Sequence, residues 1–189
     1  MAKKILLLTG DCAEDYEVKV PQQALMMLGY EVHIAAPNKK KGDMLQLVVH
    51  DFTGLDTYIE LTGHRIPVDI PAEEANAADY VGLVVPGGRA PEYIRMYPAT
   101  IKLVQEFFAA NKPVAAVCHG TQLLAAAQVL KGKTTTSYPA CAAECKLAGA
   151  EWKDEQVVVC ENLVTAQAWP DHPKWLRAFV ELLGAKISI

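Results

Sequence analysis

The sequence alternates short apolar runs with segments of helical periodicity, and this alternation constrains the fold more than any other feature. Several of the runs are uninterrupted, which is typical of strands with both faces covered. Strands are predicted at residues 5–9, 31–36, 80–85, 114–117, 157–160 and 163–166, with a shorter one near 133–136. Helices are predicted between them at residues 18–28, 98–110, 120–130, 140–147 and 173–183. This order predicts an α/β fold with a mostly parallel sheet.

One segment does not follow the alternation. Residues 45–69 contain short β-type pieces at 45–50 and 66–68, broken by Gly54 and Gly63. We expect this segment to be an insertion or a hairpin outside the main sheet. No repeat, low-complexity tract or Pro/Ser-rich linker divides the chain, so one domain over residues 1–189 is expected.

Composition excludes several classes of protein. The formal net charge of -4 leaves no basic surface for phosphates, so a nucleic-acid partner is not expected. The longest apolar stretches, at 80–86 and 113–118, are far shorter than the roughly 20 residues of a membrane span, so no membrane partner is expected. No signal-peptide cleavage site separates the first apolar run from the acidic residues after it, which indicates a cytoplasmic protein. Five cysteines, an odd number, argue against a complete disulfide framework.

The segment Ala116-Val117-Cys118-His119-Gly120 follows a predicted strand and precedes a predicted helix. A nucleophile flanked by small residues at this spacing is typical of a nucleophile elbow. A helix N-terminus would also lower the pKa of the Cys118 thiol, so we expect a reactive nucleophile there. His119 is a candidate base, although adjacent side chains seldom point at each other; it could instead face a neighbouring loop or subunit.

Another loop should end at the same edge of the sheet, where ligands bind in parallel α/β folds. Gly87 and Gly88 follow the strand at 80–85, allow close approach of the backbone, and can direct N–H groups at a developing oxyanion. Arg89 follows them as a candidate substrate-binding residue. Glu92 could orient His119, or it could be a solvated loop carboxylate.

The loop after the first strand is acidic. Residues 10–17 contain four acids, and helix capping explains most of them. Glu17 lies nearest the following apolar run, so it is expected to be buried. A buried carboxyl has a raised pKa suited to proton transfer, which makes Glu17 a candidate general acid and base.

Other candidates give weaker signals. Cys141 and Cys145 share one helix face, but Cys160 and His172 do not complete a zinc spacing, so a packed helix is favoured over a metal site. Trp169, His172 and Trp175 could line a pocket or simply cover the sheet.

Three motifs together resemble the ThiJ/PfpI superfamily, which includes PfpI-type peptidases, glyoxalase III enzymes and protein deglycases. They are Glu14-Asp15-Tyr16-Glu17, Pro86-Gly87-Gly88-Arg89-Ala90-Pro91-Glu92 and Ala116-Val117-Cys118-His119-Gly120. The resemblance covers essentially the whole chain, includes His50-Asp51-Phe52, and is closest to the plant-type glyoxalase III branch. It implies a flavodoxin-like three-layer sandwich, similar to class I glutamine amidotransferase domains.

The resemblance also implies roles for the site residues. Cys118 would be the nucleophile, Glu17 would hydrogen-bond it, and His119 would lie beside it. Glu92 would complete a Cys-His-Glu arrangement across a subunit interface, which implies a homodimer or higher homo-oligomer.

Three functions fit this residue set. The favoured one is a cofactor-independent glyoxalase III, a D-lactate dehydratase-type lyase that converts methylglyoxal and glyoxal to lactate and glycolate, with protein deglycase activity as an extension. The alternatives are a PfpI-type cysteine peptidase and a redox-sensing stress chaperone in which Cys118 is oxidised. The expected substrate is a small reactive aldehyde, and neither a metal nor another cofactor is expected.

Overall fold

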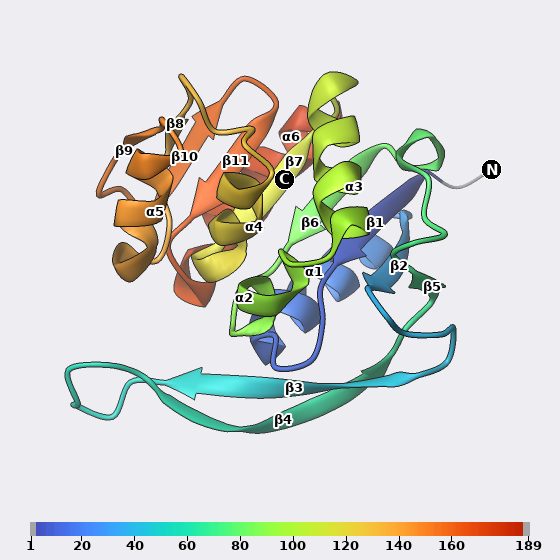
Figure 1. The fold of residues 1–189 in the computed structure, drawn as a ribbon, viewed down its shortest axis with the longest axis horizontal. Helices are drawn as coiled ribbons and strands as arrows, with labels where there is room; N and C mark the ends of the chain where they lie inside the picture. The colour runs from blue at the N-terminus through green and yellow to red at the C-terminus, as the bar shows by residue number, and fades with distance from the viewer. Residues whose placement is uncertain (1–2, 187–189) are drawn as a thin grey trace.

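A seven-stranded sheet forms the centre of the computed structural model, which describes residues 3–186 (Figure 1). The strand order is β10-β11-β7-β6-β1-β2-β5. All neighbouring strands are parallel except β10, which runs antiparallel to β11. The bounds of these strands are β1 Lys4–Leu8, β2 Glu31–Ala36, β5 Ile70–Pro71, β6 Gly82–Val85, β7 Val114–Val117, β10 Val157–Cys160 and β11 Leu163–Ala166.

Helices cover both faces of the sheet, which explains the uninterrupted apolar runs. Ile5 and Leu7 of β1 face one apolar core, with α1 (Asp15–Met27) and α6 (His172–Leu182) packed on it. Leu6 and Leu8 face the other core, which is covered by α3 (Pro98–Ala109), α4 (Thr121–Ala126) and α5 (Ala142–Leu147). The expected flavodoxin-like three-layer fold is therefore confirmed. None of the helices within residues 3–186 has the length and apolar character needed to cross a membrane.

The remaining elements are short. They are α2 (Ala90–Ile94), the small parallel pair β8 (Thr134–Thr135) and β9 (Glu151–Trp152), and the 3-10 turns Ala77–Asp79, Cys118–Gly120, Pro139–Cys141 and Trp169–Asp171.

Two helix boundaries differ from the prediction by three residues or more. The first helix begins at Asp15, before the predicted start at residue 18, because the Glu14 side chain caps it by accepting the Glu17 N–H. The helix predicted at 120–130 was wrong in its length: α4 ends at Ala126 because Gln128 adopts a left-handed conformation with φ 59°. Such a residue closes a helix by turning the next N–H groups back onto its last carbonyls.

The segment that did not fit the alternation is an antiparallel hairpin, which is one of the two arrangements expected for it. Its strands are β3 (Met44–Asp51) and β4 (Ile59–Pro67), and Figure 1 shows them as a long arm along one side of the molecule. The loop after β1 holds this arm: the Cys12 N–H donates to the Gln46 carbonyl over 2.7 Å, and the Val48 N–H donates to the Ala13 carbonyl over 2.9 Å. Backbone hydrogen bonds thus hold the hairpin against the loop that follows β1.

Candidate active site

Three loops converge at the carboxyl edge of the sheet because β7, β6 and β1 are neighbours there. The Arg89 N–H donates to the Cys12 carbonyl over 2.8 Å, which joins the loops after β6 and β1. The Gly87 N–H donates to Glu17 Oε2 over 2.7 Å. Glu17, Gly87 and Cys118, which come from three separate motifs, therefore lie together.

Cys118 occupies a strained turn. Its φ is 57°, a left-handed conformation that costs a non-glycine residue roughly 1–2 kcal/mol. A Cβ on Gly120 would lie 2.2 Å from the Val85 carbonyl oxygen, and a Cβ on Gly87 would lie 2.7 Å from Cys118 Cβ. Glycine is required at both positions by this close approach of the backbone, as an elbow demands.

The pKa of the Cys118 thiol is shifted in the opposite direction from the prediction. Burial raises this pKa, and the adjacent Glu17 carboxylate raises it further, while the backbone N–H groups of His119 and Gly88 oppose the shift by hydrogen-bonding the sulfur. The expected helix effect was wrong because residues 118–120 form a 3-10 turn, and α4 after it has only six residues. Cys118 therefore keeps its proton at neutral pH.

The imidazole of His119 lies beside the thiol. Its Nδ1 lies 3.2 Å from Cys118 Sγ, so the two adjacent side chains do meet, contrary to the geometric expectation. Burial lowers the pKa of His119 to about 4, and nearby Glu144 partly opposes this shift. The imidazole is therefore neutral at neutral pH.

Glu92, the residue expected to orient His119, is exposed on α2. Within residues 3–186 no hydrogen bond joins it to His119. Glu144 is the acid whose charge raises the pKa of the imidazole. Glu144 is itself held by Arg95 Nη1 at 2.8 Å and Gln122 Nε2 at 2.7 Å. A contribution of Glu92 across a subunit interface stays a prediction.

Two buried carboxyl groups lie at the start of α1, and the Glu17 carboxyl contacts the thiol. Glu17 is 0% exposed, and burial raises its pKa well above the ordinary value, as expected from the sequence. Glu14 is 1% exposed, and burial raises its pKa to about 7. From the sequence, Glu14 was expected only as a member of the first motif. Its place at the end of a strand and before an apolar helix was the signal that could have identified it as a site residue.

A third side of the site comes from the hairpin. His50 Nε2 lies 3.0 Å from Glu60 Oε2, and Arg89 clamps the same carboxylate with Nε at 2.8 Å and Nη2 at 2.7 Å. Arg89 also points its Nη2 at Cys12 Sγ, 3.4 Å away. The guanidinium predicted to bind substrate therefore binds Glu60, and neither His50 nor Glu60 was predicted as a site residue.

These groups enclose a small cavity. It is lined by Glu14, Glu17, His50, Phe52, Tyr58, Cys118, Tyr138, Ala168 and Trp169, and its volume is about 10 Å³. This is roughly the space of one water molecule. The ring of Tyr138 stacks on His119 with centroids 5.1 Å apart, and Tyr58 stacks on His50 at 4.1 Å. Of the C-terminal aromatic cluster, Trp169 lines the cavity whereas His172 and Trp175 are buried in the core.

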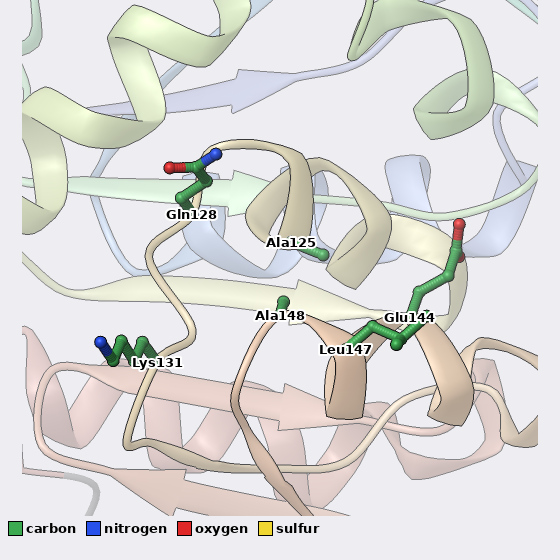
Figure 2. Close-up of a pocket in the computed structure, with 6 residues that line it drawn as sticks. All are labelled: Ala125, Gln128, Lys131, Glu144, Leu147 and Ala148. Atoms are coloured by element: carbon green, nitrogen blue, oxygen red, sulfur yellow. The ribbon is translucent and has the colours of Figure 1, made fainter.

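A larger pocket lies elsewhere, between α4 and α5 (Figure 2). Its lining consists of Ala125, Gln128, Lys131, Glu144, Leu147 and Ala148, and these residues include no cysteine, serine or histidine. Figure 2 shows the Glu144 carboxyl and the Lys131 amine on opposite sides. Cys141 and Cys145 are buried nearby, and residues 3–186 hold no cluster of three or more His, Cys, Asp or Glu side chains suited to a metal ion. The cavity at Cys118 is therefore the candidate active site.

The fold and the cavity define a class: flavodoxin-like α/β proteins with a cysteine at the elbow after a central strand and a buried glutamic acid against it. Comparison with known families agrees with this class. The chain belongs to the DJ-1/PfpI family, whose model matches residues 3–182.

Individual relatives cover the same range. The chain is 44% identical over 190 residues to "Protein DJ-1 homolog D" of Arabidopsis thaliana, with 98% of this chain and 49% of that protein covered. The chain thus spans about half the length of that relative. It is 36% identical over 180 residues to a deglycase of Pyrococcus horikoshii, with 95% and 99% covered. Among solved structures, a two-domain protein of Anabaena variabilis with DJ-1/ThiJ/PfpI-like and ferritin-like domains matches with a TM-score of 0.84 and 30% identity, covering 98% of this chain and 52% of that one.

Proposed function

We propose that this chain is a cysteine-dependent enzyme of the glyoxalase III type that converts small 2-oxoaldehydes to 2-hydroxy acids without glutathione, a metal or another cofactor. One observation carries the proposal: Cys118 Sγ lies 3.2 Å from the neutral imidazole of His119 and against the buried carboxyl of Glu17, in a cavity about the size of one water molecule. Such a site suits a small substrate that needs a nucleophile and a group that both donates and accepts protons.

The first step is addition of the thiol to the aldehyde. His119 Nδ1 takes the thiol proton as the sulfur bonds to the aldehyde carbon. The raised pKa keeps Glu17 in its acid form, so Glu17 donates its proton to the aldehyde oxygen. The products are a hemithioacetal, a Glu17 carboxylate and an imidazolium. The N–H groups of Gly88 and His119, which face the sulfur, support the oxygen while it carries charge.

The second step moves hydrogen between two carbons. The Glu17 carboxylate removes the proton from the former aldehyde carbon while the neighbouring carbonyl oxygen gains a proton, which gives an enediol. Glu17 then returns its proton to the neighbouring carbon while the first hydroxyl loses its proton, so one proton passes in all from the first oxygen to the second. The result is a thioester of the 2-hydroxy acid on Cys118. Water then adds its hydroxyl to the acyl carbon and gives its proton to the Glu17 carboxylate, and the imidazolium returns its proton to the departing sulfur. The 2-hydroxy acid leaves, and Cys118, His119 and Glu17 are restored to their starting protonation states.

The test is a methylglyoxal assay without glutathione, run beside a casein digest. Wild-type protein is expected to form lactate, and Cys118→Ala is expected to reduce this activity to background. Cys160→Ser is the matched control, because Cys160 lies on the outer strand β10, away from the cavity. Wild-type protein that forms no lactate would remove the proposal.

The names of relatives support an extension of the substrate range. The proteins of Pyrococcus horikoshii and Pyrococcus furiosus that match this chain are called deglycases. We propose that the same thiol also acts on early adducts of methylglyoxal with amines and thiols. Release of lactate from a preformed adduct, after free aldehyde has been removed, tests this extension.

A PfpI-type peptidase is the second candidate. The contact between His119 Nδ1 and Cys118 Sγ favours it, because a cysteine peptidase needs this pair. The size of the cavity opposes it, because a polypeptide needs an open groove and the rings of Tyr58, Tyr138 and Trp169 close this one. Digestion of casein by wild-type protein and its loss in Cys118→Ala would favour the peptidase.

A redox-sensing role is less well supported. Oxidation to a sulfenic acid begins from the thiolate, and burial raises the pKa of Cys118 so that the thiol form dominates.

A further inference from the structure

Glu14 has one carboxyl oxygen that the protein does not use. Its Oε2 accepts the Glu17 N–H over 2.9 Å and so caps α1. Its Oε1 is buried and has no hydrogen-bond partner within residues 3–186, on a residue that is only 1% exposed. A buried polar atom without a partner costs about 1–3 kcal/mol. An acid retained at this cost indicates a partner that the isolated chain does not supply.

The unused oxygen belongs to a residue that borders the cavity. Glu14 lines the same cavity as Glu17 and Cys118. The other titratable groups around it are His50 and Tyr58 from the hairpin, and Tyr138 from the loop after β8. Asp15, the next acid along α1, is occupied elsewhere, because its carboxyl lies 3.0 Å from His64 Nδ1. Glu14 is therefore the acid with a free oxygen beside Glu17.

We propose that Glu14 is a second acid–base residue of this site, which hydrogen-bonds the carbonyl oxygen next to the attacked carbon and thereby selects 1,2-dicarbonyl substrates over simple aldehydes. This inference rests on the proposed glyoxalase-type function and assigns a substrate class to it. A simple aldehyde can form the hemithioacetal with Cys118, but it has no second oxygen for Glu14.

The proton exchange balances. As Glu17 removes the proton from the first carbon, the electron pair of that C–H bond forms the enediol double bond, and Glu14 donates its proton to the second oxygen. In the return step, the first hydroxyl gives its proton to Glu14 as the thioester carbonyl forms, and Glu17 protonates the second carbon. Both carboxyl groups end as they began, and no oxidant or reductant is needed.

The protonation state of Glu14 is suited to this exchange. Burial raises its pKa to about 7, against the opposing backbone N–H groups of Glu17, His50 and Tyr16, and the charge of Asp15 adds to the rise. The residue thus carries a proton below that pH and can donate it. Turnover is expected to decline above a pH of about 7 as Glu14 ionises.

Glu14→Gln tests the inference. The glutamine oxygen can still accept the Glu17 N–H, so the helix cap is kept while the proton is lost. Lactate formation from methylglyoxal should fall about 100-fold in kcat, and the decline above neutral pH should disappear. Protection of Cys118 from iodoacetamide by propanal, which has no second oxygen, should remain equal to that of the wild type.

The matched control is Asp15→Asn. It removes the neighbouring acid but leaves Glu14 in place, so the pH-dependent decline should persist and move to slightly lower pH. If Glu14→Gln does not fold, Glu14→Asp is the variant to test. Aspartate is a good N-cap, but its carboxyl is one methylene further from the substrate. The kcat should therefore fall at least 10-fold, and turnover should still decline above neutral pH.

Two results overturn the inference, and they are distinguishable. Full kcat in a folded Glu14→Gln or Glu14→Asp variant, with a wild-type pH profile, would remove the role of Glu14 and leave the proposed function standing. Wild-type protein that forms no lactate would remove the proposed function and the role of Glu14 with it.

Discussion

The cavity at Cys118 has two walls of different construction. The elbow wall consists of Cys118, Glu17 and Gly87, all buried. Gly87 and Cys118 directly follow β6 and β7, which are parallel strands with hydrogen-bonded neighbours on both sides. The hairpin wall carries His50 and Tyr58 and belongs to a two-stranded ribbon that extends away from the sheet (Figure 1). Most side chains of β4 in this ribbon are exposed.

The contrast suggests a division of roles. A site needs its reacting groups held within fractions of an ångström, and central strands provide such rigidity. A cavity of about 10 Å³ also has to admit a substrate larger than water, so part of its lining must move. A two-stranded ribbon has few buried contacts and opens locally at low cost. We therefore expect chemistry to depend on the elbow wall, and access and placement to depend on the hairpin wall.

The largest effect is expected from Glu17→Gln on the elbow wall. The amide can still accept the Gly87 N–H, but it can neither donate an acid proton nor act as the base. Lactate formation should fall by roughly 10²–10⁴-fold, the range for loss of a general acid or base, while the melting temperature stays close to that of the wild type. Full turnover in this variant would assign the proton transfer to another residue and break the division.

A pair of glycine substitutions compares the packing of the two walls. A Cβ at Gly87 would lie 2.7 Å from both Cys118 Cβ and Glu17 Oε2. Gly87→Ala should therefore lower the free energy of unfolding by about 1–3 kcal/mol and should reduce activity. Gly54 at the hairpin tip has φ 87°, and a Cβ there would meet no atom within 4 Å, so Gly54→Ala should cost only about 1 kcal/mol. Urea unfolding of both variants makes the comparison, and equal costs would contradict it.

The smallest effect is expected from Glu60→Gln on the hairpin wall. Hydrogen bonding to Arg89 lowers the pKa of Glu60 to about 2, so the wild-type residue is a carboxylate throughout the physiological range. The amide weakens the hydrogen bond to His50, and kcat/KM should fall about 5-fold, mainly through KM, since a single weakened hydrogen bond is worth roughly 1 kcal/mol. The control is Glu181→Gln, which alters a surface pair with Arg177 on α6. A loss in kcat as large as that of Glu17→Gln would show that the hairpin takes part in the chemistry.

Local pattern was sufficient for much of the fold. The strands at 31–36, 114–117, 157–160 and 163–166 have the predicted bounds. Short continuous apolar runs between turn residues are typical of strands in a sheet that is covered on both faces. The elbow at Cys118 was also predictable. The sharp turn brings the strand and the following helix into contact, so small residues are needed at fixed positions on both sides of the cysteine. The length of α4 was not predictable, since the left-handed Gln128 that ends it has no glycine or proline signal.

The site itself was predicted only in part. Glu17, Gly87, Gly88, Cys118 and His119 were expected at one sheet edge and lie there. Arg89 binds Glu60 instead of facing the cavity, and Glu14, His50 and Tyr58 were not expected as site residues. The hairpin was the least readable segment, because an exposed ribbon leaves little apolar periodicity in its sequence.

The sequence by itself determined the α/β class, the position of the nucleophile and the family, because each depends on residues close together along the chain. Only the tertiary structure decided the protonation of Cys118 and Glu14. The thiol pKa of Cys118 is raised where its position before a helix predicted a lowered one, and Glu14 acquires a pKa of about 7. Burial is the largest cause of both shifts, and burial depends on which distant segments close over a residue, in this case the hairpin and the loops carrying Tyr138 and Trp169.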